Sequence, residues 1–439
     1  MTSQRRISLL AAIGIGVGSM IGAGVFSDLW VDVLAVGRWY WLAIVVAALV
    51  ALANALSTAQ LASRYPVAGG AYSYGRAELG PIAGHIAGAA FVGGKTVSVA
   101  VGAGVLGAYV LPGNAAGIAT AAIVLAWALN SRGITRTAAG ATVIAIVVVT
   151  ALVALVVMAT VASDPTVSWA PSVALLDDSA GAADAGGPPF LVAVAATFFA
   201  FAGYARIATL GEEVREPARN IPRAIVTALA IVVVVYLGVA FALHRHFGAP
   251  FLIDTDGAIT VDEDFAAAPL DALAAAVGMP VWIITVAAAL SIGGALLAVM
   301  AGAGRTAMAM AREGDLPARL AHQGTSGAPW RAEGAIALVA IALVWTQGVS
   351  LILVSAASVL TYYAVANIAA VSQQRGGRTA ALRVPVAVSI VGLAASALLA
   401  VVAVQSSAAS VWPTVALLVI VVGWPLVAAA IRKGRNAPR

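Results

Sequence analysis

The stretch that decides the fold is GIGVGSMIGAGVF (residues 14–26), an apolar segment in which five of the thirteen residues are glycine. Glycine in a helix interior costs roughly 1 kcal/mol relative to alanine. One interpretation is close packing between helices through the small residues Gly14, Gly18 and Gly22. The other is a membrane-spanning helix that unwinds at residues 22–24, since irregular backbone at membrane depth survives only where it lines a cavity or is buried in protein. We favour the unwound helix.

The composition of the whole chain supports a membrane environment. Of the 439 residues, 62% are hydrophobic and 10% are charged, whereas soluble domains carry about 25% charged residues. The apolar residues come in repeated runs of about 20, the length that crosses a hydrocarbon core roughly 30 Å thick. We predict twelve spans, at about 7–27, 38–62, 82–111, 115–130, 136–162, 188–210, 222–246, 280–303, 331–347, 351–372, 384–405 and 410–431.

The basic residues indicate the orientation of these spans. With the N-terminus inside, all but four of the 24 Lys and Arg residues fall on the inner side. Arg38 and Arg245 fall outside, and Lys95 and Arg206 lie at membrane depth. Because inner loops of membrane proteins carry the excess of Lys and Arg, we expect a multi-pass cell-membrane protein with both termini cytoplasmic. We expect no acidic side chain inside a span, which disfavours carboxylate proton relays.

Several other classes of function are disfavoured. Cysteine is absent, so thiolate chemistry and zinc–thiolate sites are excluded. The basic residues lie in short loops between apolar runs, which argues for topology rather than nucleic-acid binding. The glycine-rich stretches lack the Lys-Ser/Thr ending of a phosphate-binding loop. We therefore expect no enzyme activity, metal, cofactor or nucleic-acid partner, and a monomer or homodimer in the lipid bilayer.

A second interruption is predicted in FFAFAGYARIATL (residues 198–210), where Gly203 lies near the middle of the sixth span. This segment follows the first interrupted helix by five spans. Interrupted helices at corresponding positions of two halves indicate the midplane site of a transporter. Residues 7–162 and 188–372 would then form two inverted repeats, with residues 384–431 forming two further helices.

These segments resemble the amino acid–polyamine–organocation permeases. The matching stretches occur in the order of that family across eight spans: GSMIGAGVF (18–26), RYPVAGGAYSYGRAELG (64–80), FFAFAGYARIATLGEEVREPARNIPRAI (198–225) and GRTAMAMAREGDLP (304–317). The resemblance implies an all-α polytopic membrane protein with the LeuT-type fold of five-plus-five inverted repeats. It also implies secondary active transport of an amino acid by alternating access.

The resemblance places the substrate at the two interruptions. Amide N–H groups of the first would bind the substrate carboxylate, and carbonyls freed at residues 17–20 and 201–203 would bind its ammonium group. The positive end of a helix dipole favours an anion at such a place. The implied substrate-binding residues are Ile21, Gly22, Ala23, Gly24, Phe201, Ala202 and Gly203.

Lys95 is a further candidate, because it lies in the middle of the third span. A lysine at the bilayer centre costs at least about 2.5–3.5 kcal/mol, so it should face the protein interior and have a function or a partner. It could contact an anionic group of the substrate, replace a sodium ion beside freed carbonyls, or carry a proton. A structural hydrogen-bond anchor is the alternative.

Gating or coupling roles are assigned to a few more residues. By resemblance, Phe199 matches an aromatic gate, and the coupling or gating candidates are Lys95, Phe199, Arg206, Glu212, Glu213 and Ser291. The family often has an acid after its Gly-aromatic pair, where this chain has Ala205 and Arg206, so that acid cannot couple protons here. The predicted function is uptake of neutral or acidic amino acids with protons. The alternatives are an obligate amino acid/amine exchanger and a cationic amino acid or polyamine permease.

Overall fold

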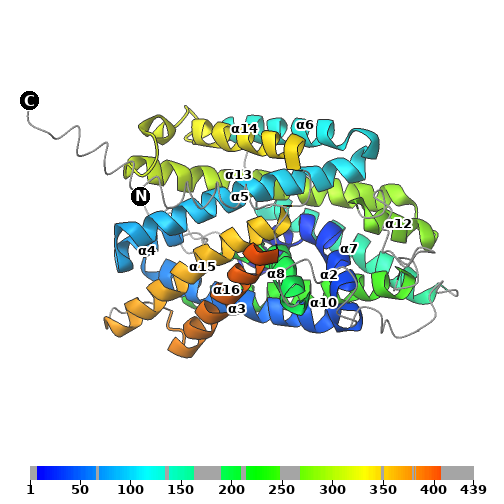
Figure 1. Ribbon diagram of the computed structural model, residues 1–439, viewed down its shortest axis with the longest axis horizontal. Coiled ribbons are helices and arrows are strands. Elements are labelled where there is room, and N and C mark those ends of the chain that lie inside the picture. The colour runs from blue at the N-terminus through cyan, green and yellow to red at the C-terminus, as the bar shows by residue number, and fades with distance from the viewer. Residues whose placement is uncertain are drawn as a thin grey trace, which may run out of the picture.

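The computed structural model describes residues 7–65, 69–133, 138–162, 189–208, 214–247, 267–347, 351–377, 380 and 382–406. These residues fold into helices, and one isolated bridge pairs Ile7 with Val214. Long apolar runs become helices in a membrane because a helix satisfies its own backbone hydrogen bonds. The long helices pack side by side into one bundle, with α2 and α8 near its middle (Figure 1).

The helices are numbered as in Figure 1. In chain order they are α1 (Leu9–Met20), α2 (Ala23–Val36), η1 (Gly37–Trp39), α3 (Tyr40–Arg64), α4 (Ala71–Leu79), α5 (Pro81–Val110), η2 (Pro112–Asn114), α6 (Ala115–Ser131), α7 (Ala138–Val161), α8 (Pro189–Phe201), η5 (Ala202–Tyr204), α9 (Ala205–Ala208), α10 (Pro217–Phe247), α12 (Pro269–Ala276), α13 (Val281–Arg312), η7 (Ala318–Ala321), α14 (Trp330–Gln347), α15 (Ile352–Arg375) and α16 (Val386–Ser406).

The described helices agree with most of the predicted spans. Nine are long and apolar enough to cross a membrane, and the bent pair of α1 and α2 makes a tenth. The predicted span at 331–347 is the helix α14, which is not among these ten and carries two charged residues, Arg331 and Glu333. The predicted span at 410–431 lies outside the described residues. The chain is thus a polytopic helical membrane protein.

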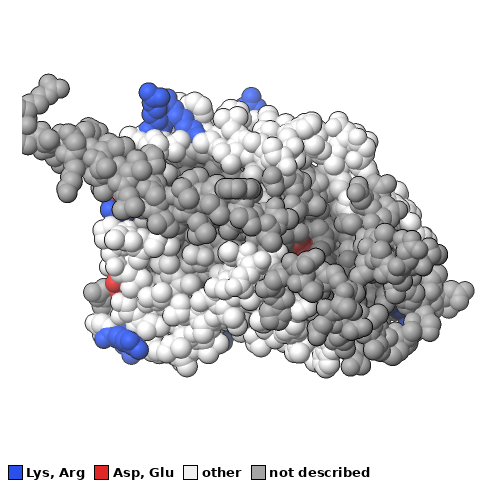
Figure 2. Space-filling view, viewed as in Figure 1, with Lys and Arg blue, Asp and Glu red and all other residues white. Residues whose placement is uncertain are grey.

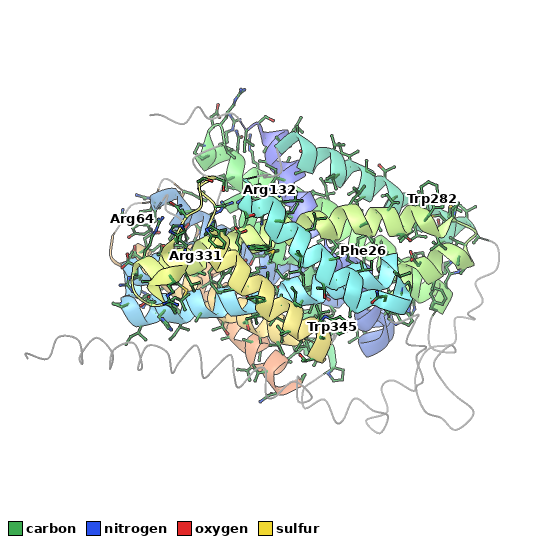
Figure 3. All side chains as sticks on the ribbon, turned by 90° about the horizontal axis from the view of Figure 1, so that it is seen from above. Phe26, Arg64, Arg132, Trp282, Arg331 and Trp345 are labelled. Atoms are coloured by element: carbon green, nitrogen blue, oxygen red, sulfur yellow. The ribbon has the colours of Figure 1, made fainter. Side chains whose placement is uncertain are left out.

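Charged side chains gather at the ends of the bundle. Figure 3 places Arg64, Arg132 and Arg331 toward one end and Trp282 toward the other. These three arginines belong to three different predicted inner loops, so their common location agrees with the predicted succession of spans. On the face shown in Figure 2, blue side chains lie mainly near the left and upper edges, and white side chains make up most of the coloured surface, as expected of a surface in contact with lipid.

A buried polar seam joins α3, α15 and α16. Asn54 on α3 accepts a hydrogen bond from Asn367 on α15 at 2.7 Å and donates one to Ser396 on α16 at 2.9 Å. One turn along α3, Ser57 pairs with Ser389 on α16 at 2.9 Å. Each hydroxyl and amide in this seam therefore finds its partner on a different helix, which fixes how the three helices pack.

The short helix α4 is held against the end of α13. Arg76 forms ion pairs with Glu313 at 3.1 Å and with Asp315 at 3.2 Å, and the Tyr72 hydroxyl donates to Asp315 at 2.8 Å. Isolated ion pairs at a surface contribute about 0–1 kcal/mol each. The arrangement fixes the position of α4 more than it stabilises the fold.

The short helix α12 is joined to α2 through α5. Tyr109 on α5 donates its hydroxyl to the carbonyl of Phe26 at 2.7 Å and accepts the amide N–H of Leu270 at 3.1 Å. A single side chain therefore links α12 to the backbone of α2. The next residue on α12 is Asp271, whose carboxylate accepts a hydrogen bond from Thr285 on α13 at 3.4 Å.

The Asp271 carboxyl makes the stability of the fold depend on pH. Burial raises its pKa from 3.8 to about 7, and the Thr285 hydroxyl opposes that rise only in part. Between these two values the folded state holds a proton that the unfolded chain has released, so stability falls as the pH rises through this window. We expect Asp271→Asn to raise the melting temperature at about pH 8 and to change it little near pH 4. Thermal unfolding of both proteins at both pH values measures this, and an equal shift at the two would contradict it.

Candidate functional site

The first interruption divides the first predicted span into α1 and α2. Helix α1 ends at Met20, α2 begins at Ala23, and the two axes meet at 48°. The last turn of α1 closes when the Ile21 amide donates to the Val17 carbonyl at 2.9 Å. The predicted interruption of this span is therefore confirmed, but it lies at residues 21–22 rather than 22–24, because Ala23 and Gly24 already belong to the first turn of α2.

The second interruption has a different form. Helix α8 changes into the 3₁₀-helix η5 at Ala202 and then into α9, and the three together make one candidate span, 189–207. A 3₁₀ turn is tighter than an α turn and leaves a poorer hydrogen-bond geometry. The helix is therefore tightened at the predicted Gly203 rather than sharply bent.

The two interruptions lie against each other. A Cβ atom added to Gly203 would collide with the carbonyl oxygen of Ser19 and would lie 2.7 Å from the Met20 nitrogen. Gly24 is as closely packed, because a Cβ atom there would overlap the side chain of Ala200 on α8. Only glycine permits backbone to approach backbone this closely. The structure thus brings the two predicted substrate-binding segments together.

Side chains from two other helices hold carbonyls at the interruptions. The Tyr236 hydroxyl on α10 lies 2.8 Å from the Met20 carbonyl oxygen and 3.0 Å from that of Ala200, so it spans both segments. Ser291 on α13 donates to the Ile21 carbonyl. Sequence reasoning named Ser291 but missed Tyr236, although a single tyrosine within the apolar run IVVVVYLGVAF (231–241) was a signal.

The amide groups at the start of α2 are buried and lack a side-chain cap. Gly22, Ala23 and Gly24 are all buried, and the N-cap residue is Gly22, which has no side chain to accept a hydrogen bond from the first-turn amides. The first N–H groups of a helix have no intrahelical acceptor, and within the described ranges no other acceptor for these three amides is found. A Cβ atom on Gly22 would have Ala295 of α13 as its nearest neighbour, at 3.5 Å. Donors at the start of a helix can bind an anion.

Lys95 does not contact these amides. Gly102, seven residues further along α5, is the residue that lies beside Ala23. A Cβ atom added to Gly102 would be 3.8 Å from the Ala23 side chain. Seven residues of helix span about 10 Å and return to the same face, so Lys95 faces the same side of α5 at a different depth. Its side chain is 8% exposed, and its ammonium nitrogen lies 6.0 Å from the centre of the Phe91 ring. The structure thus separates Lys95 from the other predicted substrate contacts.

Asp28 corrects the expectation that no acidic side chain lies inside a span. The first span extends to Val36 as α2, and this places Asp28 within it, with no exposed surface. The predicted end at residue 27 was too early, because the bend lets the helix resume after the glycines. A buried carboxyl therefore lies one turn beyond the first interruption.

The remaining predicted residues are distributed differently. Phe201 is fully buried with its ring centre 5.1 Å from that of Tyr236, whereas Phe199 on the same helix is only partly buried. Arg206 on α9 is exposed rather than directed into the bundle. Glu212 and Glu213 lie outside the described residues.

A family profile described as "Amino acid permease" matches residues 7–427. An uncharacterized transporter of Mycobacterium tuberculosis is 43% identical over 84% of this chain and 80% of its own length. A branched-chain amino acid permease of Bacillus subtilis is 27% identical over 52% of this chain and 51% of its own, and a chloroplastic cationic amino acid transporter of Arabidopsis thaliana is 28% identical over 55% and 44%.

Proposed function

Because the chain belongs to the amino acid permease family, we propose that it carries neutral or acidic amino acids into the cell, together with protons, by alternating access. The family and its members show a membrane-embedded transporter of amino acids or related solutes. The substrate charge, the coupling to protons, the cell membrane as location and the cytoplasmic termini are parts of the proposal.

One observation carries the choice of site: uncapped amides of α2 lie buried where the two interruptions meet. The amides of Gly22, Ala23 and Gly24 offer donors for a carboxylate, and the positive end of the helix dipole adds to their attraction. The close contact of Gly203 with Ser19 brings the second interruption to the same point. A zwitterion would fit there, because amide donors and backbone carbonyls lie side by side. Three of these carbonyls also accept hydrogen bonds from Tyr236 or Ser291.

The order of the elements supports the proposed inverted repeats. In residues 7–162 the short helix α4 comes directly before the third span, α5. In residues 188–372 the short helix α12 comes directly before α13, the third span of that half. The interrupted helix is the first of each half. Rocking of one group of helices against another around the interruptions would then alternate access to the substrate.

The charge of Lys95 favours neutral or acidic substrates. Lys95 lies about 10 Å along α5 from the level of the uncapped amides, and a positive charge buried at that distance would still repel arginine, lysine and polyamines. The competing function is a cationic amino acid or polyamine permease. The relative in Arabidopsis thaliana described above is a cationic amino acid transporter. An obligate exchanger is the other alternative, and it differs in requiring an amino acid on both sides of the membrane.

Uptake into proteoliposomes tests the proposal. We expect saturable uptake of a neutral or acidic amino acid, faster when the outside is acidic, and weak competition by arginine or putrescine. Liposomes without protein are the control. Uptake that requires internal amino acid would favour the exchanger, and uptake led by arginine would favour the cationic permease. If no amino acid is taken up in either mode, the proposed function is wrong.

A further inference from the structure

The proposed function leaves one buried carboxyl unused. Asp28 lies on α2, one helical turn beyond the uncapped amides, and has no exposed surface. We propose that Asp28 is the group that carries the proton cotransported with the substrate. This inference rests on the transport function proposed above and names the site of its coupling.

The contacts of Asp28 leave half of the carboxyl free. One oxygen, Oδ1, accepts a hydrogen bond from the neighbouring Ser27 hydroxyl at 2.6 Å. The other, Oδ2, is buried and has no hydrogen-bond partner among the residues that the structure describes. This oxygen points back toward the interruption, since it lies 3.1 Å from the position of a Cβ atom on Gly24.

No cation in the described residues neutralises Asp28. Of the titratable groups on the helices packed against α2, Tyr236 of α10 interacts electrostatically with Asp28, Tyr109 of α5 donates to the Phe26 carbonyl of α2, and α8 contributes none. Tyr40 of α3 packs on His244 of α10. His244 lies two turns, or about 12 Å, along α10 from Tyr236. Asp271 belongs to the separate helix α12.

Lys95 is too distant to serve as a counter-ion. Gly102 of α5 and Ala23 of α2 lie side by side. Asp28 lies five residues along α2 from this level in one direction. Lys95 lies seven residues along α5 from it in the opposite direction. The two residues are thus about 18 Å apart along the helix axes. An isolated buried carboxylate is costly, and binding a proton removes the charge.

Tyr236 connects the carboxyl to both interruptions. Its phenol interacts electrostatically with Asp28, and its hydroxyl lies within hydrogen-bond distance of the Met20 and Ala200 carbonyls. A phenol has a single proton to donate. No hydrogen bond joins Tyr236 to Asp28, so the two groups act on each other through charge. An ionised Asp28 would attract the phenol proton, and a protonated Asp28 would leave it to the carbonyls, so the proton on Asp28 would change how strongly Tyr236 binds α1 and α8.

The test compares two modes of transport in Asp28→Asn. In counterflow, labelled substrate exchanges with internal substrate, and no net proton movement is needed. We expect Asp28→Asn to retain counterflow and to lose the acceleration that an acidic outside gives to net uptake. A pH-sensitive dye inside the vesicles should report proton entry with substrate for the wild type and none for the variant.

A matched control is available in Glu333, a buried acid of α14 that also has one oxygen without a partner. Glu333→Gln makes the same chemical change away from the interruptions and should keep the acceleration. Asp28→Asn with wild-type acceleration and proton entry would overturn the inference while leaving the transport function intact. A wild type that takes up no amino acid would instead contradict the proposed function.

Ser27→Ala keeps the inference testable if Asp28→Asn does not fold. The Ser27 hydroxyl favours the charged form of Asp28, so its removal should extend rapid uptake to higher pH. An unchanged pH profile in Ser27→Ala would count against Asp28 as the proton carrier.

Discussion

Replacing Gly203 with alanine is expected to abolish transport and to lower the melting temperature. The added methyl group would meet the carbonyl of Ser19 and the nitrogen of Met20. These are backbone atoms, which cannot rotate away as a flexible side chain would, so α1 and η5 must separate. Overpacking in a tight interior costs about 1–3 kcal/mol, and here the displaced atoms belong to the proposed substrate site. Uptake and thermal unfolding of the purified variant measure both effects.

Gly302→Ala provides the matched control. Gly302 lies within α13, and a Cβ atom there would meet no other atom within 4 Å. Alanine is favoured over glycine in a helix interior by about 1 kcal/mol, so this variant should be as stable as the wild type or more so, and should transport normally. Normal uptake by Gly203→Ala would show that the two interruptions need not touch for transport.

Replacing Lys95 with methionine should have opposite effects on transport and on stability. The lysine is buried mid-span, and within the described part of the chain no hydrogen bond or ion pair of its ammonium group is found. A charge held there costs at least about 2.5–3.5 kcal/mol, and methionine of similar length removes this cost. We therefore expect Lys95→Met to insert normally and to unfold at a higher temperature. Transport should be lost.

Lys95→Arg separates charge from shape in this experiment. If the positive charge selects the substrate, Lys95→Arg should retain part of the uptake that Lys95→Met loses. A lower melting temperature for Lys95→Met would reveal that Lys95 is a structural anchor. Wild-type uptake with an unchanged pH profile in Lys95→Met would remove Lys95 from the mechanism.

The sequence was informative where a residue type has few structural uses. Five glycines in an apolar run predicted a weak point in the first span, and the structure has a 48° bend there. Gly203 was also singled out correctly as a special position. The sequence could not show which residues would pack against Gly203. Its neighbour Ser19 is almost two hundred positions away in the chain and contacts it only after folding.

The two misjudged residues, Asp28 and Tyr236, were missed for different reasons. Asp28 was placed outside the membrane because a span was assumed to end about 20 residues after it begins, and a bent helix pair violates that rule. Tyr236 was overlooked because a tyrosine in an apolar helix is ordinarily a packing residue. Its role depends on which carbonyls α1 and α8 leave unpaired, and that is a property of three helices together.

The polar seam of α3, α15 and α16 has a consequence for shortened forms of the chain. Helix α16 lies beyond the two proposed repeats, yet Ser389 and Ser396 complete hydrogen bonds that begin on α3. If the chain stopped after α15, Ser57 and part of Asn54 would face hydrocarbon, where an unmatched polar group is costly. A minimal ten-helix version would therefore need apolar replacements along α3 before it could exist alone, and α16 should travel with α3 and α15 as one rigid block during the transport cycle.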